Sequence, residues 1–170
     1  MHDGVLRDYN FRVPSGYDGS TALPLVINMH GYTSNASQQE FYSNMTPIAE
    51  EQNFFVVYPN GIGNAWNVGF PGVPFVNGVD DVGFINALID TLTNNYLVDL
   101  TRVYSTGMSN GGYMSYRLAC ELNDRITAIA SVTGSMNDSM RYHCYNPQSI
   151  PVLEIHGTDD PTVPDRKSVV

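Results

Sequence analysis

Short apolar runs alternate with longer amphipathic segments along most of the chain. Runs rich in β-branched and aromatic residues, bounded by turn residues, predict strands at 5–13, 23–29, 54–58, 102–106, 126–132 and 150–155. Apolar positions spaced three or four apart predict helices over 39–51, 80–96 and 110–122. Strands that are apolar on both faces and alternate with helices indicate a parallel sheet covered on two sides. The predicted class is therefore α/β, with functional residues at the carboxyl ends of the strands.

One segment departs from this alternation. Residues 59–78 are rich in Gly, Pro and Asn, which predicts a single long loop. Loops of that length in compact domains are usually functional. No repeat, charge block or low-complexity linker divides the sequence, so we expect residues 1–170 to form one domain.

The composition is that of a globular protein, with 42% apolar, 11% aromatic and 15% charged residues. A net charge of -9 argues against nucleic acid or an anionic membrane as partner, because both would repel the chain. No stretch is long and apolar enough to span a bilayer. Met1 leads into polar residues rather than a signal peptide, so an exported form would have lost its leader.

The sequence contains two cysteines, Cys120 and Cys144. They could form a disulfide in an oxidising compartment, or both could be free buried thiols. The sequence alone leaves both alternatives open.

The most specific chemical motif is Gly107-Met-Ser109-Asn-Gly111. It fits G-x-S-x-G directly after a predicted strand and directly before a predicted helix, where a serine nucleophile sits on a strained turn. Glycines on either side avoid collision with the neighbouring strand and helix. We interpret Ser109 as a nucleophile; the alternative is a tight turn that happens to hold a serine.

A serine nucleophile needs two backbone N–H groups to hold the developing oxyanion. The residue after the nucleophile supplies one, here Asn110, and a loop after an earlier strand supplies the other. His30-Gly31 marks that loop, and the N–H of Tyr32 is the predicted second donor. We interpret His30 itself as a packed residue that shapes the loop.

A metal or cofactor is not expected. Asp80 and Asp81 are adjacent at the start of a predicted helix, where N-capping explains them better than metal binding does.

Six stretches of the sequence together resemble a known family. They are INMHGYTSN, YPNGIGNAWN, GVDDVGFINALID, RVYSTGMSNGGYMSYRLACEL, AIASVTGSM and VLEIHGTDDPTVP. The chain resembles the secreted α/β-hydrolase esterases that include feruloyl esterases, acetyl xylan esterases and polyhydroxybutyrate depolymerase-like proteins. The resemblance implies an α/β-hydrolase fold and a secreted serine esterase without cofactor or metal. The implied substrates are small or polysaccharide-linked feruloyl or acetyl esters, or polyester-type esters.

The resemblance also implies roles for three residues. The nucleophile falls on Ser109, and the catalytic acid falls on Asp160, with Asp159 as the weaker candidate. The alternative for these two aspartates is a solvated turn. Trp66 lies in the loop that borders the active-site cleft in the family, so it would bind substrate; equally, it could cover the edge of the core.

The chain departs from the family in its histidines. The family supplies a catalytic histidine beyond the aspartate, after one further strand, whereas residues 161–170 contain none. The sequence therefore predicts a C-terminally truncated α/β-hydrolase, and residues 165–170 look unlike the family, as a cloning remnant would. His143 could stand in as the base; His156 has the place of a structural residue, and His2 lies at a terminus.

The missing segment has two expected consequences. Activity should be very low, and the chain could be an inactive binding fragment of the same fold; a serine peptidase is the remaining alternative. The strand at 150–155 should be left as an unpaired apolar edge, which favours homodimers.

Overall fold

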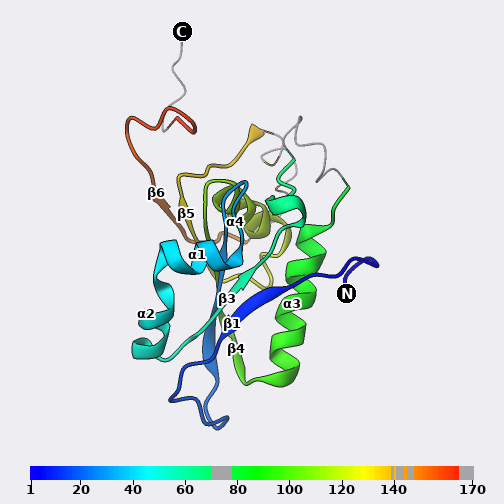
Figure 1. Ribbon diagram of the computed structural model, residues 1–170, viewed down its shortest axis with the longest axis vertical. Helices are drawn as coiled ribbons and strands as arrows, with labels where there is room; N and C mark the ends of the chain where they lie inside the picture. Colours follow the sequence, from blue (N-terminus) through cyan, green and yellow to red (C-terminus); the bar gives the residue numbers. More distant parts are fainter. Residues whose placement is uncertain (70–77, 139, 141–143, 145–147, 165–170) are drawn as a thin grey trace.

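The computed structural model describes residues 1–69, 78–138, 140, 144 and 148–164. In these ranges the chain forms one six-stranded sheet with the strand order β1-β3-β2-β4-β5-β6 (Figure 1). The strands are β1 (Tyr9–Arg12), β2 (Leu23–Met29), β3 (Phe55–Pro59), β4 (Val98–Met108), β5 (Ala128–Val132) and β6 (Val152–Ile155). Only β1 is antiparallel to its neighbour. The predicted α/β class with a mostly parallel sheet is confirmed.

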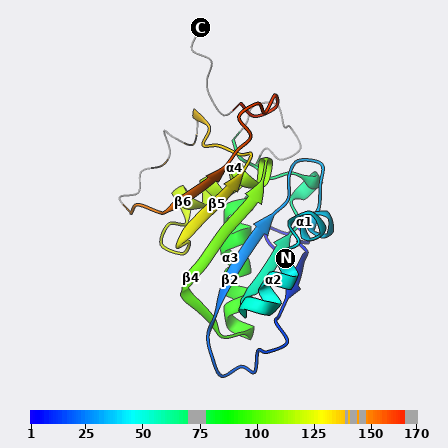
Figure 2. The same ribbon diagram turned by 90° about the vertical axis from the view of Figure 1, so that its left-hand side faces the viewer.

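Helices lie on both faces of the sheet (Figure 2). They are α1 (Ala36–Ser43), α2 (Met45–Gln52), the short 3₁₀ helix η1 (Ile62–Asn64), α3 (Asp81–Asn95) and α4 (Asn110–Glu121). The main core lies between the sheet and α3 and α4, and a smaller one lies between the sheet and α1 and α2. Alternation along β2 explains this division: Leu25 and Ile27 belong to the main core, whereas Val26 packs against the smaller one.

The helix expected over 39–51 is two helices, α1 and α2, so that prediction is wrong. They meet at Asn44, whose φ of 46° and ψ of 36° are left-handed. The Asn44 N–H donates to the carbonyl of Glu40 and ends α1. Asparagine tolerates this conformation better than most residues, and periodicity alone did not indicate the break.

The strand at 150–155 forms an exposed apolar edge of the sheet, as the sequence analysis expected. Val152, Leu153 and Ile155 of β6 are 48%, 57% and 51% exposed. β6 is the last strand of the sheet, and among the described residues no helix packs over it on the face that α1 and α2 occupy (Figure 2). Apolar side chains there line an open cavity of ≈ 290 Å³ that includes Leu153.

The two cysteines are paired. Cys120, in the last turn of α4, and Cys144 form a disulfide with their Cα atoms 4.8 Å apart, within the range that the bond requires. Of the two alternatives that the sequence left open, the structure has the disulfide. None of the helices in the described ranges is both long and apolar enough to cross a bilayer.

Candidate active site

Ser109 lies at the bend between β4 and α4. Its φ of 52° and ψ of -116° are rare for a residue with a side chain. Residues held in such strained backbone conformations cluster at functional sites. The Ser109 N–H donates to the carbonyl of Val132 on β5 (2.8 Å), and its carbonyl accepts from the N–H of Tyr113 (3.0 Å). Both sides of the bend are therefore held, by the sheet and by the first turn of the helix.

The glycines of the motif are required by close packing. A Cβ on Gly107 would lie 2.5 Å from the carbonyl carbon of Gly111 and 2.7 Å from the carbonyl oxygen of Met29. A Cβ on Gly111 would collide with the same Met29 oxygen. The reason that the sequence analysis gave for these glycines is confirmed, because β2, β4 and α4 meet here without room for side chains.

Ser109 lines an open cleft of ≈ 420 Å³ at the carboxyl edge of the sheet. The other residues that line it are Gly31, Tyr32, Thr33, Ser34, Gln38, Tyr42 and Met108. Gly31 is so close that a Cβ built on it would lie 3.6 Å from Cβ of Ser109. The structure thus brings together the serine and the loop that the sequence predicted as its partner.

The conformation of this loop is set by His30. The carbonyl of Gly31 accepts from Nδ1 of His30 (2.8 Å) and from the N–H of Ser34 (3.1 Å). In a trans peptide the N–H points opposite to the carbonyl, so the Tyr32 N–H is directed away from these donors. The two bonds therefore hold the peptide unit that carries the Tyr32 N–H.

His30 is packed inside the protein. It is fully buried, and its Nε2 accepts from the N–H of Gly61 (2.9 Å). Burial lowers the pKa of His30, so the ring is neutral and carries its proton on Nδ1. A ring bonded on both nitrogens is not available as a base for Ser109.

Asn110 is the first residue of α4. The N–H groups of a first helical turn have no partner within the helix and point toward an incoming anion. The side chain of Asn110 is buried and turns the other way: Oδ1 accepts from the N–H of Trp66 (2.6 Å), and Nδ2 donates to the Trp66 carbonyl (3.2 Å).

Trp66 is fully buried and belongs to the main core. Its Nε1 donates to the carbonyl of His30 (2.9 Å), and its ring lies 5.1 Å from the imidazole of His30. Because the indole has no exposed face in this structure, it has none to offer a substrate. The expectation of a substrate contact therefore needs correction, and the alternative that the residue covers the core describes its position.

Asp160 lies in the loop that follows β6, and Ser109 follows β4 in the same way, so both are placed at the carboxyl edge of the sheet. Its Oδ1 accepts from the N–H groups of Val163 (2.9 Å) and Thr162 (2.8 Å). These bonds lower the pKa of Asp160 and keep it ionised. Asp159 is exposed. Asp160 has no hydrogen bond with Ser109, so a histidine would have to stand between them.

None of the described histidines forms a hydrogen bond with Ser109. His156 lies between Oε1 of Glu154 (3.0 Å) and the carbonyl of Val163 (2.5 Å). His2 bonds to Asp80 (3.1 Å) at the N-terminal end. His143 lies outside the described residues. Among the residues that the structure does describe, the base for Ser109 is therefore missing.

One described group has the donor atoms of a metal site. The ligand atoms of His2, Asp3 and Asp80 lie within 4.8 Å of one another. Asp80 also caps α3, accepting from the N–H of Gly83 (2.8 Å), as the sequence analysis expected. These bonds, and the exposure of the aspartates, account for the group without an ion.

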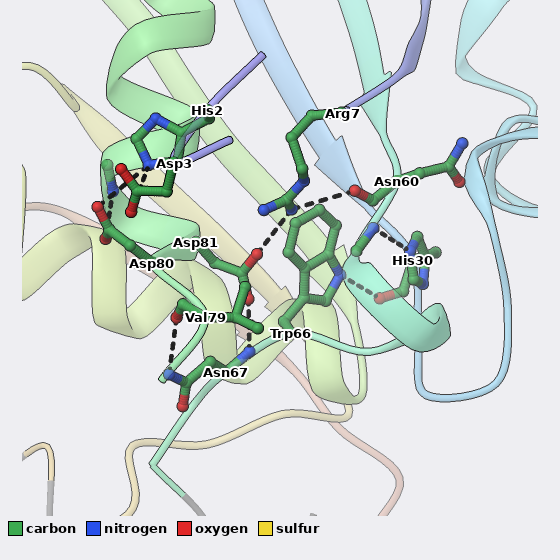
Figure 3. A network of polar contacts seen from close by, with 12 residues as sticks. His2, Asp3, Arg7, His30, Asn60, Trp66, Asn67, Val79, Asp80 and Asp81 are labelled. Atoms are coloured by element: carbon green, nitrogen blue, oxygen red, sulfur yellow. Dashed lines mark hydrogen bonds and ion pairs between the residues drawn. The ribbon is translucent and has the colours of Figure 1, made fainter. Parts of the chain in front are cut away.

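Asp81 has a role that the sequence analysis missed. Its side chain is fully buried; Oδ1 bonds to Arg7 (2.7 Å), and Oδ2 accepts from the N–H of Asn67 (2.7 Å) (Figure 3). The pair ties the N-terminal segment to α3 and to the loop that carries Trp66. No local signal distinguished Asp81 from Asp80, because the partner Arg7 is remote in sequence.

Comparison with known proteins places this chain in a family. A model described as the prolyl oligopeptidase family matches residues 39–147. The chain belongs to this α/β-hydrolase family. Feruloyl esterase B of Piromyces equi is 34% identical over 158 residues, covering 89% of this chain and 29% of that protein. Feruloyl esterase C of Emericella nidulans is 30% identical over 172 residues, covering 93% of this chain and 56% of that protein.

Solved structures agree with this placement. A thermostable esterase superposes with a TM-score of 0.73 at 25% identity, over 95% of this chain and 45% of the other. An acetyl xylan esterase from Aspergillus awamori has the same TM-score, 0.73, at 19% identity, over 92% and 69% of the two chains, and this supports the fold alone. The resemblance to α/β-hydrolase esterases is confirmed. The chain spans between 29% and 56% of these two curated relatives.

Proposed function

We propose that this chain carries the nucleophile and oxyanion hole of a serine carboxylic-ester hydrolase. Ser109 Oγ attacks the ester carbonyl carbon, its proton passes to a base, and the alcohol leaves with a proton returned from that base. Water then cleaves the acyl-enzyme in the reverse manner and releases the acid. The N–H groups of Tyr32 and Asn110 hold the oxyanion in both steps.

The observation that carries the proposal is the strained φ of Ser109 beside the loop at Gly31. A strained, glycine-flanked serine next to backbone donors is the arrangement that acyl transfer uses. Asp160 would orient the imidazole of a histidine that these 170 residues do not supply after it. The proposal therefore includes very low activity for the chain as it stands.

The substrate is proposed to be a feruloyl, acetyl or polyester-type ester, free or linked to polysaccharide. The names of the relatives support the first two classes. The cleft supports an aromatic acyl group, because Tyr32 and Tyr42 line it and are 49% and 65% exposed. Aromatic side chains pair with a planar acyl ring at a suitable separation.

A serine peptidase is a second candidate. It is favoured by the description of the family model as prolyl oligopeptidase, whereas the similar curated proteins named above are esterases. Peptide bonds have a poorer leaving group than esters, so protonation by a general acid matters more for them. A catalytically inactive binding fragment is the third candidate, with the same cleft and no turnover.

The location and assembly of the protein are also proposals. The disulfide between Cys120 and Cys144 supports a secreted protein, because such bonds persist in oxidising compartments. The exposed apolar edge of β6 supports a homodimer, because unpaired edges recruit further strands.

The test is hydrolysis of p-nitrophenyl acetate by the 170-residue chain, by Ser109→Ala and by His143→Ala. Loss of the base from such an enzyme costs about 10⁶ in turnover, and the oxyanion hole retains roughly 10³ to 10⁴ over water. We therefore expect weak, saturable hydrolysis well below about 10 s⁻¹, with no cleavage of proline-containing peptide anilides. If turnover is near that value and His143→Ala abolishes it, the base is present in this chain. If the chain does not accelerate hydrolysis at all, the result favours the inactive fragment.

A further inference from the structure

We propose that Trp66 and the side chain of Asn110 are positioning residues, which together set the distance between the two oxyanion donors. The inference rests on the proposed function. It assigns Asn110 two tasks: its backbone N–H faces the oxyanion, and its side chain holds the loop behind the other donor.

The first contact joins Asn110 to the backbone of Trp66. Oδ1 accepts from the Trp66 N–H (2.6 Å), and Nδ2 donates to the Trp66 carbonyl (3.2 Å). A side-chain amide presents one acceptor and one donor side by side, which a carboxylate or hydroxyl cannot do in the same way. Asn110 is 8% exposed and Trp66 fully buried, so neither bond can be replaced readily by water.

The second contact joins Trp66 to the loop of residues 30–34 after β2, called the oxyanion loop below. The indole N–H donates to the carbonyl of His30 (2.9 Å), and the indole and imidazole rings lie 5.1 Å apart (Figure 3). His30 in turn holds the carbonyl of Gly31 (2.8 Å), which fixes the direction of the Tyr32 N–H. A continuous path of hydrogen bonds therefore runs from Asn110, at one donor, to the peptide of Tyr32 at the other.

The segment before Trp66 braces the same loop. The N–H of Gly61 donates to Nε2 of His30 (2.9 Å), and the N–H of Thr33 donates to the carbonyl of Asn64 (2.8 Å). The oxyanion loop thus rests on a second loop at several points. Asn110 is the residue that ties this second loop back to the nucleophile bend.

A tryptophan that only filled the core would affect stability without affecting the transition state. A positioning role has a different consequence, because misplacing a catalytic group by about 1 Å can cost about 10²-fold in rate. The two alternatives are separable by kcat and KM, and by the emission of Trp66, which is the sole tryptophan of the chain.

The test compares Asn110→Asp with Asn28→Asp. The carboxylate introduced by Asn110→Asp keeps an acceptor for the Trp66 N–H, but it has no donor and sets a negative charge against the Trp66 carbonyl. Asn28 is also buried, at 1%, and its amide contacts Gln39 and Met45 rather than Trp66. It is therefore a matched control for the cost of burying a carboxylate.

For Asn110→Asp we expect kcat on p-nitrophenyl acetate to fall about tenfold or more with KM within about twofold, and Trp66 emission to move to longer wavelength. Asn28→Asp should change neither once equal amounts of folded protein are compared by circular dichroism. If Asn110→Asp does not fold, Trp66→Phe keeps a ring against His30, loses the indole N–H and should show the same fall in kcat.

Two outcomes would overturn the inference: unchanged kcat in both site variants, or a rise in KM at constant kcat. Measuring the wild type and Ser109→Ala as well distinguishes failure of this inference from failure of the proposed function. If the wild type shows no acceleration over buffer, the proposed function and the inference fail together. If the wild type accelerates hydrolysis and the Asn110 and Trp66 variants do so equally well, only the inference fails.

Discussion

Arg7 and Asp81, 74 positions apart in the chain, form an ion pair whose side chains are 4% and 0% exposed. The guanidinium also lies 3.8 Å above the ring of Phe84 and donates to the carbonyl of Asn60 (3.2 Å). The pair therefore joins the N-terminal segment, the loop after β3 and the start of α3 (Figure 3). Asn60 and Asn67, which bond to Arg7 and Asp81 respectively, lie on the same loop as Trp66, so the pair supports that loop.

Replacing Asp81 by Asn should strongly destabilise the protein. The guanidinium of Arg7 would stay buried without its counter-charge, which typically costs about 3–5 kcal/mol. The control is Asp90→Asn, because Asp90 pairs with Arg125 but is 57% exposed, and such pairs contribute about 0–1 kcal/mol. Urea unfolding measures both, and equal losses would contradict the prediction.

Replacing Gly111 by Ala should also destabilise the fold, because the added methyl group meets the backbone of Met29. Overpacking against backbone costs about 1–3 kcal/mol or more. Gly157→Ala is the matched control, since a Cβ at Gly157 meets nothing within 4 Å and such a change is usually within about 0.5 kcal/mol. A Gly111→Ala variant as stable as Gly157→Ala would show that the bend is looser than described.

Stability should depend on the protonation of His156. The hydrogen bonds to Glu154 and to the Val163 carbonyl, with a smaller contribution from Asp160, raise the pKa of His156. Both ring nitrogens face acceptors, so the protonated ring satisfies both. A raised folded-state pKa gives stabilisation that is complete below the unfolded value of about 6.5 and is lost as pH rises through the folded value.

The measurement is the melting temperature of the wild type and of His156→Gln, which stays neutral. The melting temperature of the wild type should exceed that of the variant by the largest amount at about pH 5.5 and by the smallest at about pH 9. A difference that grows with pH would have the wrong sign and would exclude this role.

Tyr42 should select for aromatic acyl groups, since it lines the cleft beside Ser109. An aromatic pair contributes about 0.5–1.5 kcal/mol, so Tyr42→Ala should raise KM for methyl ferulate about two- to tenfold and leave KM for p-nitrophenyl acetate nearly unchanged. Phe41→Ala is the control, because Phe41 is 81% exposed, neighbours Tyr42 and does not line the cleft. Equal effects of the two variants on methyl ferulate would contradict the assignment.

The edge of β6 should mediate self-association. Leu153→Lys should shift the protein from dimer to monomer in size-exclusion chromatography with light scattering, because charge on an edge strand opposes strand pairing. Leu100→Lys is the control, since Leu100 is 52% exposed but lies on β4. A wild type that is monomeric at high concentration would refute the dimer.

Local patterns in the sequence determined the order of elements and the motif around Ser109. The strands at 23–29 and 54–58, the helix capped at Asp80 and the serine bend all depend on apolar spacing, caps and glycines, which are local properties. For the same reason the contact between Ser109 and the loop after β2 could be predicted, because the carboxyl ends of adjacent parallel strands meet at one edge.

Only the tertiary structure decided what Trp66 and Asp81 do. The indole is buried because Asn110 and His30, remote in sequence, supply partners for its polar atoms. Asp81 is buried because Arg7, from the N-terminal segment, supplies its counter-charge. Each outcome depends on which distant residue lies opposite, and hydrophobic periodicity carries no information about that.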